Sequence, residues 1–317
     1  MRIIFVPQYP ASMRYAEWWF WKFPQEFRNR GIEVKVLGER AANEMGSRRG
    51  LEVWFSDINM SIEFECEQIK EYRLLDIRDD DVLFHADLSF PGLFHNVLFH
   101  RRPKKCFAFC HATSLNYLDY FSKDQKIKFP IEQATAQIYN KVFVGSEYHR
   151  RKLDFENAVV TYLPPPPFLS PLGTQEIDKE YDLISVSRPT EQKVDKGIED
   201  EVEQCFGPIY RPRSHTWPEY FFNLAKSKIL LISAWEETFG YQIIDAVING
   251  CIPLAPNRLC YPEILPKAYL YDNINHLCDK VYTILNNQIP MASLVPDILC
   301  KEQIINFYDK ILTEMCE

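Results

Sequence analysis

The residues whose spacing most directly suggests chemistry are three carboxylates. Two of them are adjacent, and the third follows the second by eight residues. In the segment SAWEETFGYQIIDAVINGCIPLAPN (233–257) an apolar strand ends at Trp235, and Glu236 and Glu237 follow it. Open α/β sheets bind ligands at the carboxyl ends of their strands. A Phe-Gly pair then opens an apolar helix that carries Asp245. We therefore expect the acids to hydrogen-bond two parts of one ligand, such as two sets of hydroxyls.

The backbone around these acids favours an anionic or sugar ligand. Free N–H groups at a helix start attract anions, and Gly240 allows a phosphate or sugar to approach the backbone closely. A structural explanation exists for the same residues, because a glutamate near a helix N-terminus stabilises the helix by about 0.3–1 kcal/mol without a ligand. Spacing alone leaves both explanations open.

Strands and helices alternate on both sides of this segment. Apolar strand patterns are predicted at residues 2–8, 32–38, 81–89, 104–113, 141–146, 158–163, 181–187, 228–235 and 252–256, and residues 61–69 also alternate as in a strand. Strand–helix–strand units with short returns imply parallel pairing.

A proline run divides the chain. PPPP at 164–167 can continue neither a helix nor a central strand, so it forms a stiff connector. The prediction is an α/β protein with two doubly wound, Rossmann-like domains facing a cleft. Residues 1–170 form the first domain and 171–300 the second. The amphipathic segment 301–317 forms a terminal helix that is expected to pack back on the first domain.

Composition limits the function. The formal net charge of −8 argues against a generally basic nucleic-acid-binding surface, although HRRPKK (100–105) and HRRKL (149–153) are local basic patches. Nine scattered cysteines without a C-x-x-C pair, and no leader, favour a cytoplasmic location, which would be the host cytoplasm for a phage protein. No apolar run is long enough to cross a membrane, and no residue set has metal-ligand spacing.

The stretch ETFGYQIIDAVINGCIPLA (237–255) resembles the donor-site signature of retaining GT-B glycosyltransferases of the GT4-like group. That signature has Glu-x-Phe-Gly, a second acid eight residues after the first, a glycine, and an apolar strand with proline. One element departs from the pattern, because the second acid is Asp245 instead of glutamate. The following PNRLCYPEILPKAYLY (256–271) is similar to the queuosine-tRNA mannosyltransferase-like branch, and the short chain resembles phage DNA-base glycosyltransferases.

The resemblance implies roles for residues of the second domain. Glu237 would bind hydroxyls of the donor sugar, with Glu236 and Thr238 beside it. The backbone of Phe239 and Gly240 would lie against the sugar and diphosphate. Asp245 would bind the ribose, although its side chain is one methylene shorter than the usual glutamate.

The resemblance also implies cations for the diphosphate. In SVSRPTEQKVDKG (185–197) Arg188 matches the arginine of the family pattern. The lysine is either Lys193, at the commoner offset, or Lys196, which precedes a glycine. Cleavage of a nucleotide sugar leaves negative charge on the diphosphate, and fixed cations stabilise it. The implied enzyme uses a UDP- or GDP-sugar as co-substrate and needs neither a metal nor another cofactor.

The first domain offers weaker candidates. His111 ends an apolar strand, and in the family a histidine at this place often faces the donor sugar; a structural role is equally open. The acceptor side is expected in the Pro-rich loop after the first strand, at Tyr9, Ser12, Met13 and Arg14.

We therefore expect a retaining, metal-independent glycosyltransferase. The favoured acceptor is a modified base in nucleic acid, either a hydroxymethylpyrimidine of DNA or a tRNA nucleoside, with HRRPKK and RYAEWWFW (14–21) as the segments for backbone contact and stacking. One alternative acceptor is a saccharide or small metabolite. Another class of function is a non-catalytic nucleotide-sugar-binding module, to which the aspartate at 245 points.

Overall fold

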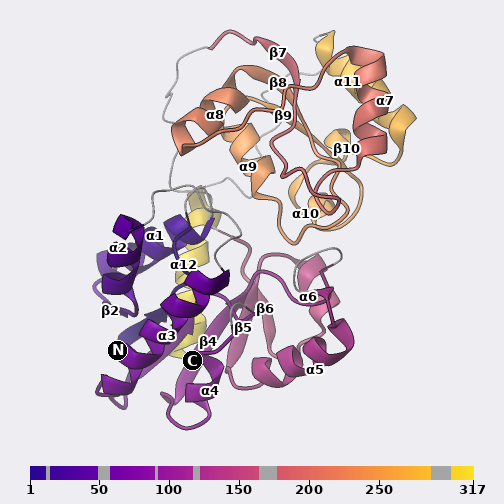
Figure 1. Cartoon of the computed structure of the whole chain (residues 1–317). Coiled ribbons are helices and arrows are strands. Elements are labelled where there is room, and N and C mark those ends of the chain that lie inside the picture. Colours follow the sequence, from indigo (N-terminus) through magenta and orange to yellow (C-terminus); the bar gives the residue numbers. More distant parts are fainter. Residues whose placement is uncertain (12–14, 49–57, 90–91, 117–121, 164–176, 287–300) are drawn as a thin grey trace.

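Two parallel sheets organise the chain in the computed structural model, which describes residues 1–11, 15–48, 58–89, 92–116, 122–163, 177–286 and 301–317 (Figure 1). The first sheet has six strands in the order β2-β1-β3-β4-β5-β6, and the second has four in the order β10-β9-β8-β7. Every pairing that joins these strands is parallel. The structure is therefore mixed α/β with two Rossmann-like sheets, as predicted.

The first sheet contains the strands of the amino-terminal half. They are β1 (Arg2–Val6), β2 (Glu33–Val36), β3 (Asp81–His85), β4 (Lys105–Cys110), β5 (Lys141–Val144) and β6 (Ala158–Val160). The helices around it are α1 (Tyr15–Asn29), α2 (Glu39–Arg48), α3 (Ile58–Leu74), α4 (His95–Leu98), α5 (Gln125–Ala136) and α6 (Glu147–Leu153). The central strands β1 and β3 are buried along their whole length, because helices cover both faces of the sheet.

The second sheet contains β7 (Tyr181–Ile184), β8 (Ser227–Leu231), β9 (Ile252–Pro256) and β10 (Leu270–Tyr271). Its helices are α7 (Lys196–Phe206), α8 (Trp217–Ala225), α9 (Tyr241–Ile248), α10 (Tyr261–Ile264) and α11 (Ile274–Leu285). The short strand β10 was not predicted. The proline run at 164–167 lies outside the described residues.

One expectation for the first half is wrong. Residues 61–69, predicted as a strand, lie within α3. Four buried positions of this helix, Met60, Phe64, Gln68 and Tyr72, are four residues apart and therefore share one helix face; Glu65 is buried beside them and accepts the N–H of Phe94. Gln68 donates from Nε2 to the carbonyl oxygen of Pro7 at 2.8 Å, so a polar side chain occupies a core position that the apolar pattern could not reveal.

The carboxyl-terminal helix α12 (Lys301–Cys316) packs against the first domain, where Figure 1 shows it in yellow among the violet elements. The ring of Phe307 lies 6.2 Å from that of Trp19. Lys105 donates from Nζ to the carbonyl oxygen of Cys316 at 2.9 Å, and Lys141 pairs with Glu314. The last segment of the chain thus completes the core on which α1 rests.

The packing of α12 predicts a stability effect. Ile311 is fully buried, so Ile311→Ala should lower the free energy of unfolding by about 2–4 kcal/mol through lost burial and a cavity. Thr313, on the exposed face of the same helix, supplies the control, and Thr313→Ala should change it by less than about 0.5 kcal/mol. Urea denaturation measures both. Equal effects would mean that α12 does not pack on the first domain in solution.

Candidate functional site

The candidate site lies where the carboxyl ends of the two sheets meet. The loop after β8 (232–240) enters it from the second domain and is held by the loop after β7, since Trp235 and Glu236 both donate their N–H to the carbonyl oxygen of Gln192, at 2.9 and 3.2 Å. From the first domain, residues 111–116 follow β4 and α6 follows β5 (Figure 1). The predicted acids therefore sit at a contact between domains.

Glu237 and Lys193 form an ion pair within the second domain. Lys193 Nζ lies 3.0 Å from Glu237 Oε2 and donates to the carbonyl oxygen of Glu236 at 2.9 Å. Their side chains are only 11% and 15% exposed. Burial raises the pKa of Glu237, but the charge and hydrogen bond of Lys193 and the N–H of Thr238 outweigh it, and the net pKa lies below the ordinary value. Glu237 is therefore an ionised acceptor with a fixed cation beside it.

The two candidate lysines occupy different environments. Lys193 is buried against Glu237, whereas Lys196 begins α7 and is exposed. Arg188 lies in the same loop as Lys193 and is half-buried. Ser187, its neighbour, donates to Gln242 Oε1 at 3.1 Å, so this loop contacts the first turn of α9. The structure thus buries Lys193 beside Glu237, brings the loop that carries Arg188 to the start of α9 through Ser187, and leaves Lys196 exposed.

Glu236 points toward the first domain. Its Oε2 lies 2.6 Å from Lys152 Nζ on α6, and its Oε1 accepts from Asn116 Nδ2 at 3.4 Å. The Glu236 carboxylate is 4% exposed and Lys152 is 18% exposed, so this is a buried ion pair between domains. Glu236 was expected to act on the donor side, but no sequence pattern predicted its ion pair with Lys152 of the first domain.

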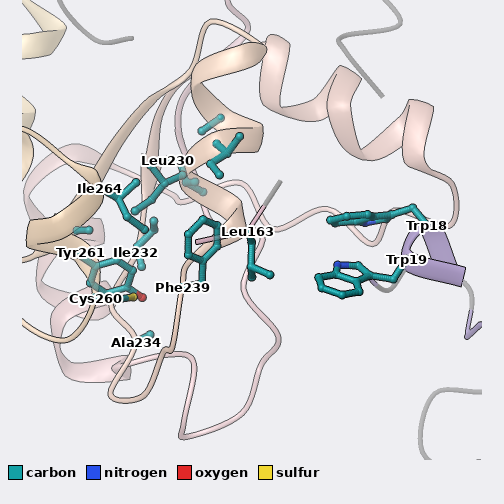
Figure 2. Close-up of a cluster of buried hydrophobic side chains, with 14 of the residues drawn as sticks. Trp18, Trp19, Leu163, Leu230, Ile232, Ala234, Phe239, Cys260, Tyr261 and Ile264 are labelled. Atoms are coloured by element: carbon teal, nitrogen blue, oxygen red, sulfur yellow. The ribbon is translucent and has the colours of Figure 1, made fainter. Parts of the chain in front are cut away.

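Residues 238–240 form further contacts at the interface between the two domains. Thr238 Oγ1 donates to the carbonyl oxygen of His111 at 3.1 Å, and its own carbonyl accepts from Ser146 Oγ at 2.6 Å. Phe239 is buried, and Figure 2 shows its ring beside Leu163 of the first domain. Gly240 has φ 87°, and a Cβ there would meet Tyr261 at 3.1 Å, so only glycine suits this position.

Asp245 is buried on α9. Tyr220 of α8 donates its hydroxyl to Asp245 Oδ2 at 3.0 Å. Burial raises the pKa of Asp245 to about 7, opposed only in part by that hydrogen bond. Tyr220 thus occupies one oxygen of the shorter acid, and the other oxygen is the one that a ribose hydroxyl could use.

His111 is a buried, neutral residue. Its Nε2 lies 3.1 Å from the carbonyl oxygen of Ala86, which can only accept, so Nε2 carries the proton. Its ring packs against Tyr15 and Phe109, with centroids at 4.4 and 4.5 Å. Burial lowers the pKa of His111 to about 3. The His111 ring therefore has a structural role in the core of the first domain. Its backbone carbonyl lies at the domain interface, where it accepts from Thr238.

The expected acceptor loop is described only in part. Tyr9 is half-buried, with its ring edge-on to Phe64 at 5.7 Å. Ser12, Met13 and Arg14 lie outside the described residues.

The two segments expected to contact nucleic acid are placed differently. HRRPKK precedes β4 and so lies at the amino-terminal edge of the first sheet, opposite the site. Arg101 donates to the carbonyl oxygens of Arg73 and Leu75, and Arg102 to that of Ile138. In the aromatic segment Trp18 and Trp19 are buried; the Trp19 indole donates to the Tyr241 hydroxyl at 3.4 Å. These tryptophans support the domain contact and are not available for base stacking.

Sequence reasoning missed several residues of the site. They are Asn116, Lys152, Tyr220 and Glu263, whose carboxylate accepts the N–H groups of Glu147 and Tyr148 at 2.7 and 2.6 Å. Lys152 lies in the basic HRRKL patch, which was the only signal. The others depend on contacts between segments far apart in the chain, which spacing cannot reveal.

In the described part of the chain, no group of three or more His, Cys, Asp and Glu side chains is arranged to hold a metal ion. No helix among those residues has the length and apolar character needed to cross a bilayer.

Comparison with known proteins finds similarity both in sequence and in structure. No protein-family model matches. A stretch of 64 residues is 44% identical to the tRNA-queuosine alpha-mannosyltransferase of Drosophila melanogaster. It makes up 20% of this chain and 17% of that protein, so the match spans less than a fifth of that curated relative.

Some of the similar solved structures align over nearly the whole chain. The lipopolysaccharide outer core galactosyltransferase WaaB has a TM-score of 0.63 at 13% identity, over 99% of this chain and 100% of that one. An alpha,alpha-trehalose-phosphate synthase of Burkholderia vietnamiensis has a TM-score of 0.60 at 11% identity, over 100% and 96%. The chain has the GT-B fold. The sheets and interface described above are thus the two Rossmann-like domains of a GT-B protein, and the sequence match to a mannosyltransferase agrees with the resemblance read from residues 237–271.

The buried carboxyl of Asp245 predicts a pH-dependent stability. Its pKa is about 7 when folded against a usual 3.8, so between these values the unfolded chain releases a proton that the folded chain keeps. This group therefore lowers stability as pH rises to 7. Asp245→Asn removes this pH dependence. The unfolding free energy of the variant minus that of wild type should therefore be about 1–3 kcal/mol more favourable to the variant at pH 8 than at pH 5.

Denaturation of wild type and variant at both pH values measures this gain, with the exposed Asp279→Asn as control. A difference between Asp245→Asn and wild type that does not change with pH would contradict the burial of an ionisable carboxyl at this position.

Proposed function

We propose that the protein is a retaining, metal-independent glycosyltransferase that moves a sugar from a UDP- or GDP-sugar to a hydroxyl of an acceptor. The observation that carries the proposal is the Lys193–Glu237 ion pair at the carboxyl edge of the second sheet of a GT-B fold. An ionised acceptor beside a fixed cation matches the chemistry of a sugar diphosphate, whose hydroxyls donate and whose phosphates attract cations. The short mannosyltransferase match supports the same class.

Each residue then has a role in the reaction. Glu237 accepts from donor-sugar hydroxyls, and Asp245 accepts from the ribose. Arg188 and Lys193 bind the diphosphate and stabilise the charge that develops as the bond from the sugar to the phosphate oxygen breaks. The acceptor hydroxyl attacks from the face that the phosphate leaves, and a phosphate oxygen takes its proton. The nucleotide sugar is the co-substrate, and no further cofactor takes part.

Donor turnover tests this assignment. With a panel of UDP-, GDP- and ADP-sugars, wild type should release nucleotide, and Lys193→Ala and Glu237→Gln should slow release by about 10²–10³-fold because each removes a charged contact to the donor. Lys196→Ala is the matched control, since Lys196 is exposed, and should stay within about twofold.

Two results would contradict the proposal. Tight binding of a nucleotide sugar without release would make the protein a non-catalytic binding module. Loss of turnover in Lys196→Ala but not in Lys193→Ala would place the diphosphate at the start of α7 instead of beside Glu237.

For the acceptor we propose a modified base in nucleic acid. The support is the similarity to a protein named for tRNA-queuosine, because hydroxyls on such a base are the groups that a glycosyltransferase can modify. The HRRPKK patch does not contribute, since it lies at the far edge of the first sheet. Arg150 and Arg151 on α6 are exposed beside the carboxyl edge of that sheet and are the cations better placed for a phosphate backbone.

Mass spectrometry identifies the acceptor. After incubation with a mixed nucleotide-sugar pool, tRNA or hydroxymethylpyrimidine DNA should gain a hexose or pentose mass. Arg150→Glu should reduce this transfer about tenfold and leave nucleotide release without acceptor unchanged, because Arg150 pairs with Glu147 on the same exposed face of α6 and does not hold the domain contact. Arg151 is left unchanged, because it lies 4.0 Å from Glu263, which binds the start of α6. Transfer to a saccharide or small metabolite alone would overturn the nucleic-acid assignment and leave the donor assignment standing.

A further inference from the structure

Buried polar atoms normally have hydrogen-bond partners, so each one without a partner calls for an explanation, such as a bound water, an ion or another molecule. Among the described residues, four side chains carry such atoms. They are His149 at both ring nitrogens, Asn249 at Oδ1, Arg258 at Nε and Tyr261 at Oη. Asn249 and Arg258 use their remaining polar atoms in hydrogen bonds to carbonyl oxygens. His149 is the one in which two polar atoms of a fully buried side chain both lack partners.

His149 is fixed at the contact between the domains. It is the third residue of α6, and its N–H donates to Ser146 Oγ at 3.0 Å. Ser146 in turn donates to the carbonyl oxygen of Thr238, two residues before the glycine that opens α9. On the other side, Glu263 of α10 accepts the first two N–H groups of the same helix. The first turn of α6 is therefore clamped by two segments of the second domain.

The charges around His149 are those of the candidate site. Lys152, one turn further along α6, pairs with Glu236, and Glu237 is close enough to act on the ring electrostatically. The ring also lies within electrostatic range of His111. His149 thus belongs to the same cluster as the donor residues but forms no side-chain bond to any of them.

The protonation state of His149 limits the ligand class. Burial, followed by the charge of Lys152, lowers the pKa of His149 to about 3, so the ring is neutral. A neutral imidazole offers one donor and one acceptor. This suits a hydroxyl, which can both accept and donate, whereas a phosphate would favour a cation. Glu237 only accepts, so the two side chains complement each other around a polyhydroxylated ring.

We propose that His149 is a further substrate-binding residue, which hydrogen-bonds a hydroxyl of the sugar held by Glu237. The inference rests on the proposed function, because it takes the ligand to be a nucleotide sugar. It adds a contact from the first domain to a sugar otherwise bound by the second. Sugars that differ in the orientation of one hydroxyl would then be distinguished by His149.

Calorimetric binding without acceptor tests the proposal. The probes are UDP, GDP, UDP-glucose and GDP-mannose, with wild type, His149→Phe and His149→Asn. For the nucleotide sugar that wild type binds, His149→Phe should weaken affinity about tenfold, and His149→Asn, which keeps a donor and an acceptor, should recover part of the loss. Affinity for the matching nucleoside diphosphate should not change. Thermal denaturation of each variant identifies any loss of fold.

The outcomes separate the two levels of inference. If wild type binds none of the four probes, the proposed function fails. If wild type binds a nucleotide sugar and His149→Phe binds it equally well, the His149 assignment fails while the proposed function stands. If both variants fold but lose affinity for the nucleotide sugar and for the nucleoside diphosphate to the same extent, the His149 assignment also fails. The residue would then only support the contact between domains.

Discussion

The rest of the site depends on two ion pairs made by neighbouring glutamates with lysines of different domains. Glu237 pairs with Lys193 inside the second domain, and Glu236 pairs with Lys152 of the first. Both pairs are largely buried, where an uncompensated charge would cost several kcal/mol, on the order of 3–5. Both lysines therefore help to fix the loop after β8. The pair with Lys193 lies within the second domain at the candidate site, and the pair with Lys152 joins the two domains.

Apolar packing extends that joint beyond the ion pairs. Trp18 lies edge-on to Tyr241 of α9 at 5.2 Å between ring centroids, and Trp217 of α8 donates to Glu17 of α1 at 2.9 Å. The helix that carries Asp245 is thus held by the aromatic side chains of α1, which are in turn covered by α12. Motion of one domain against the other would have to break these contacts together, and such closure is how many enzymes exclude water from the reacting groups.

Similarity in sequence and similarity in fold extend over different shares of the chain. The identity to a mannosyltransferase covers 64 residues, whereas similarity of fold extends over the whole chain at 11–13% identity in its full-length neighbours. The fold is thus similar along the whole chain where little of the sequence is.

The sequence by itself determined the alternation of strands and helices, the Glu-x-Phe-Gly turn and the terminal helix, because these depend on local periodicity and on the backbone freedom of Gly240. Residues 61–69 were misassigned because a polar Gln68 in the core broke the apolar pattern. Only the tertiary structure decided between Lys193 and Lys196 as the partner of Glu237, turned Glu236 toward Lys152, and left the ring nitrogens of His149 buried without hydrogen-bond partners. Those outcomes depend on which distant segments meet, and chain spacing carries no information on side-chain contacts between domains.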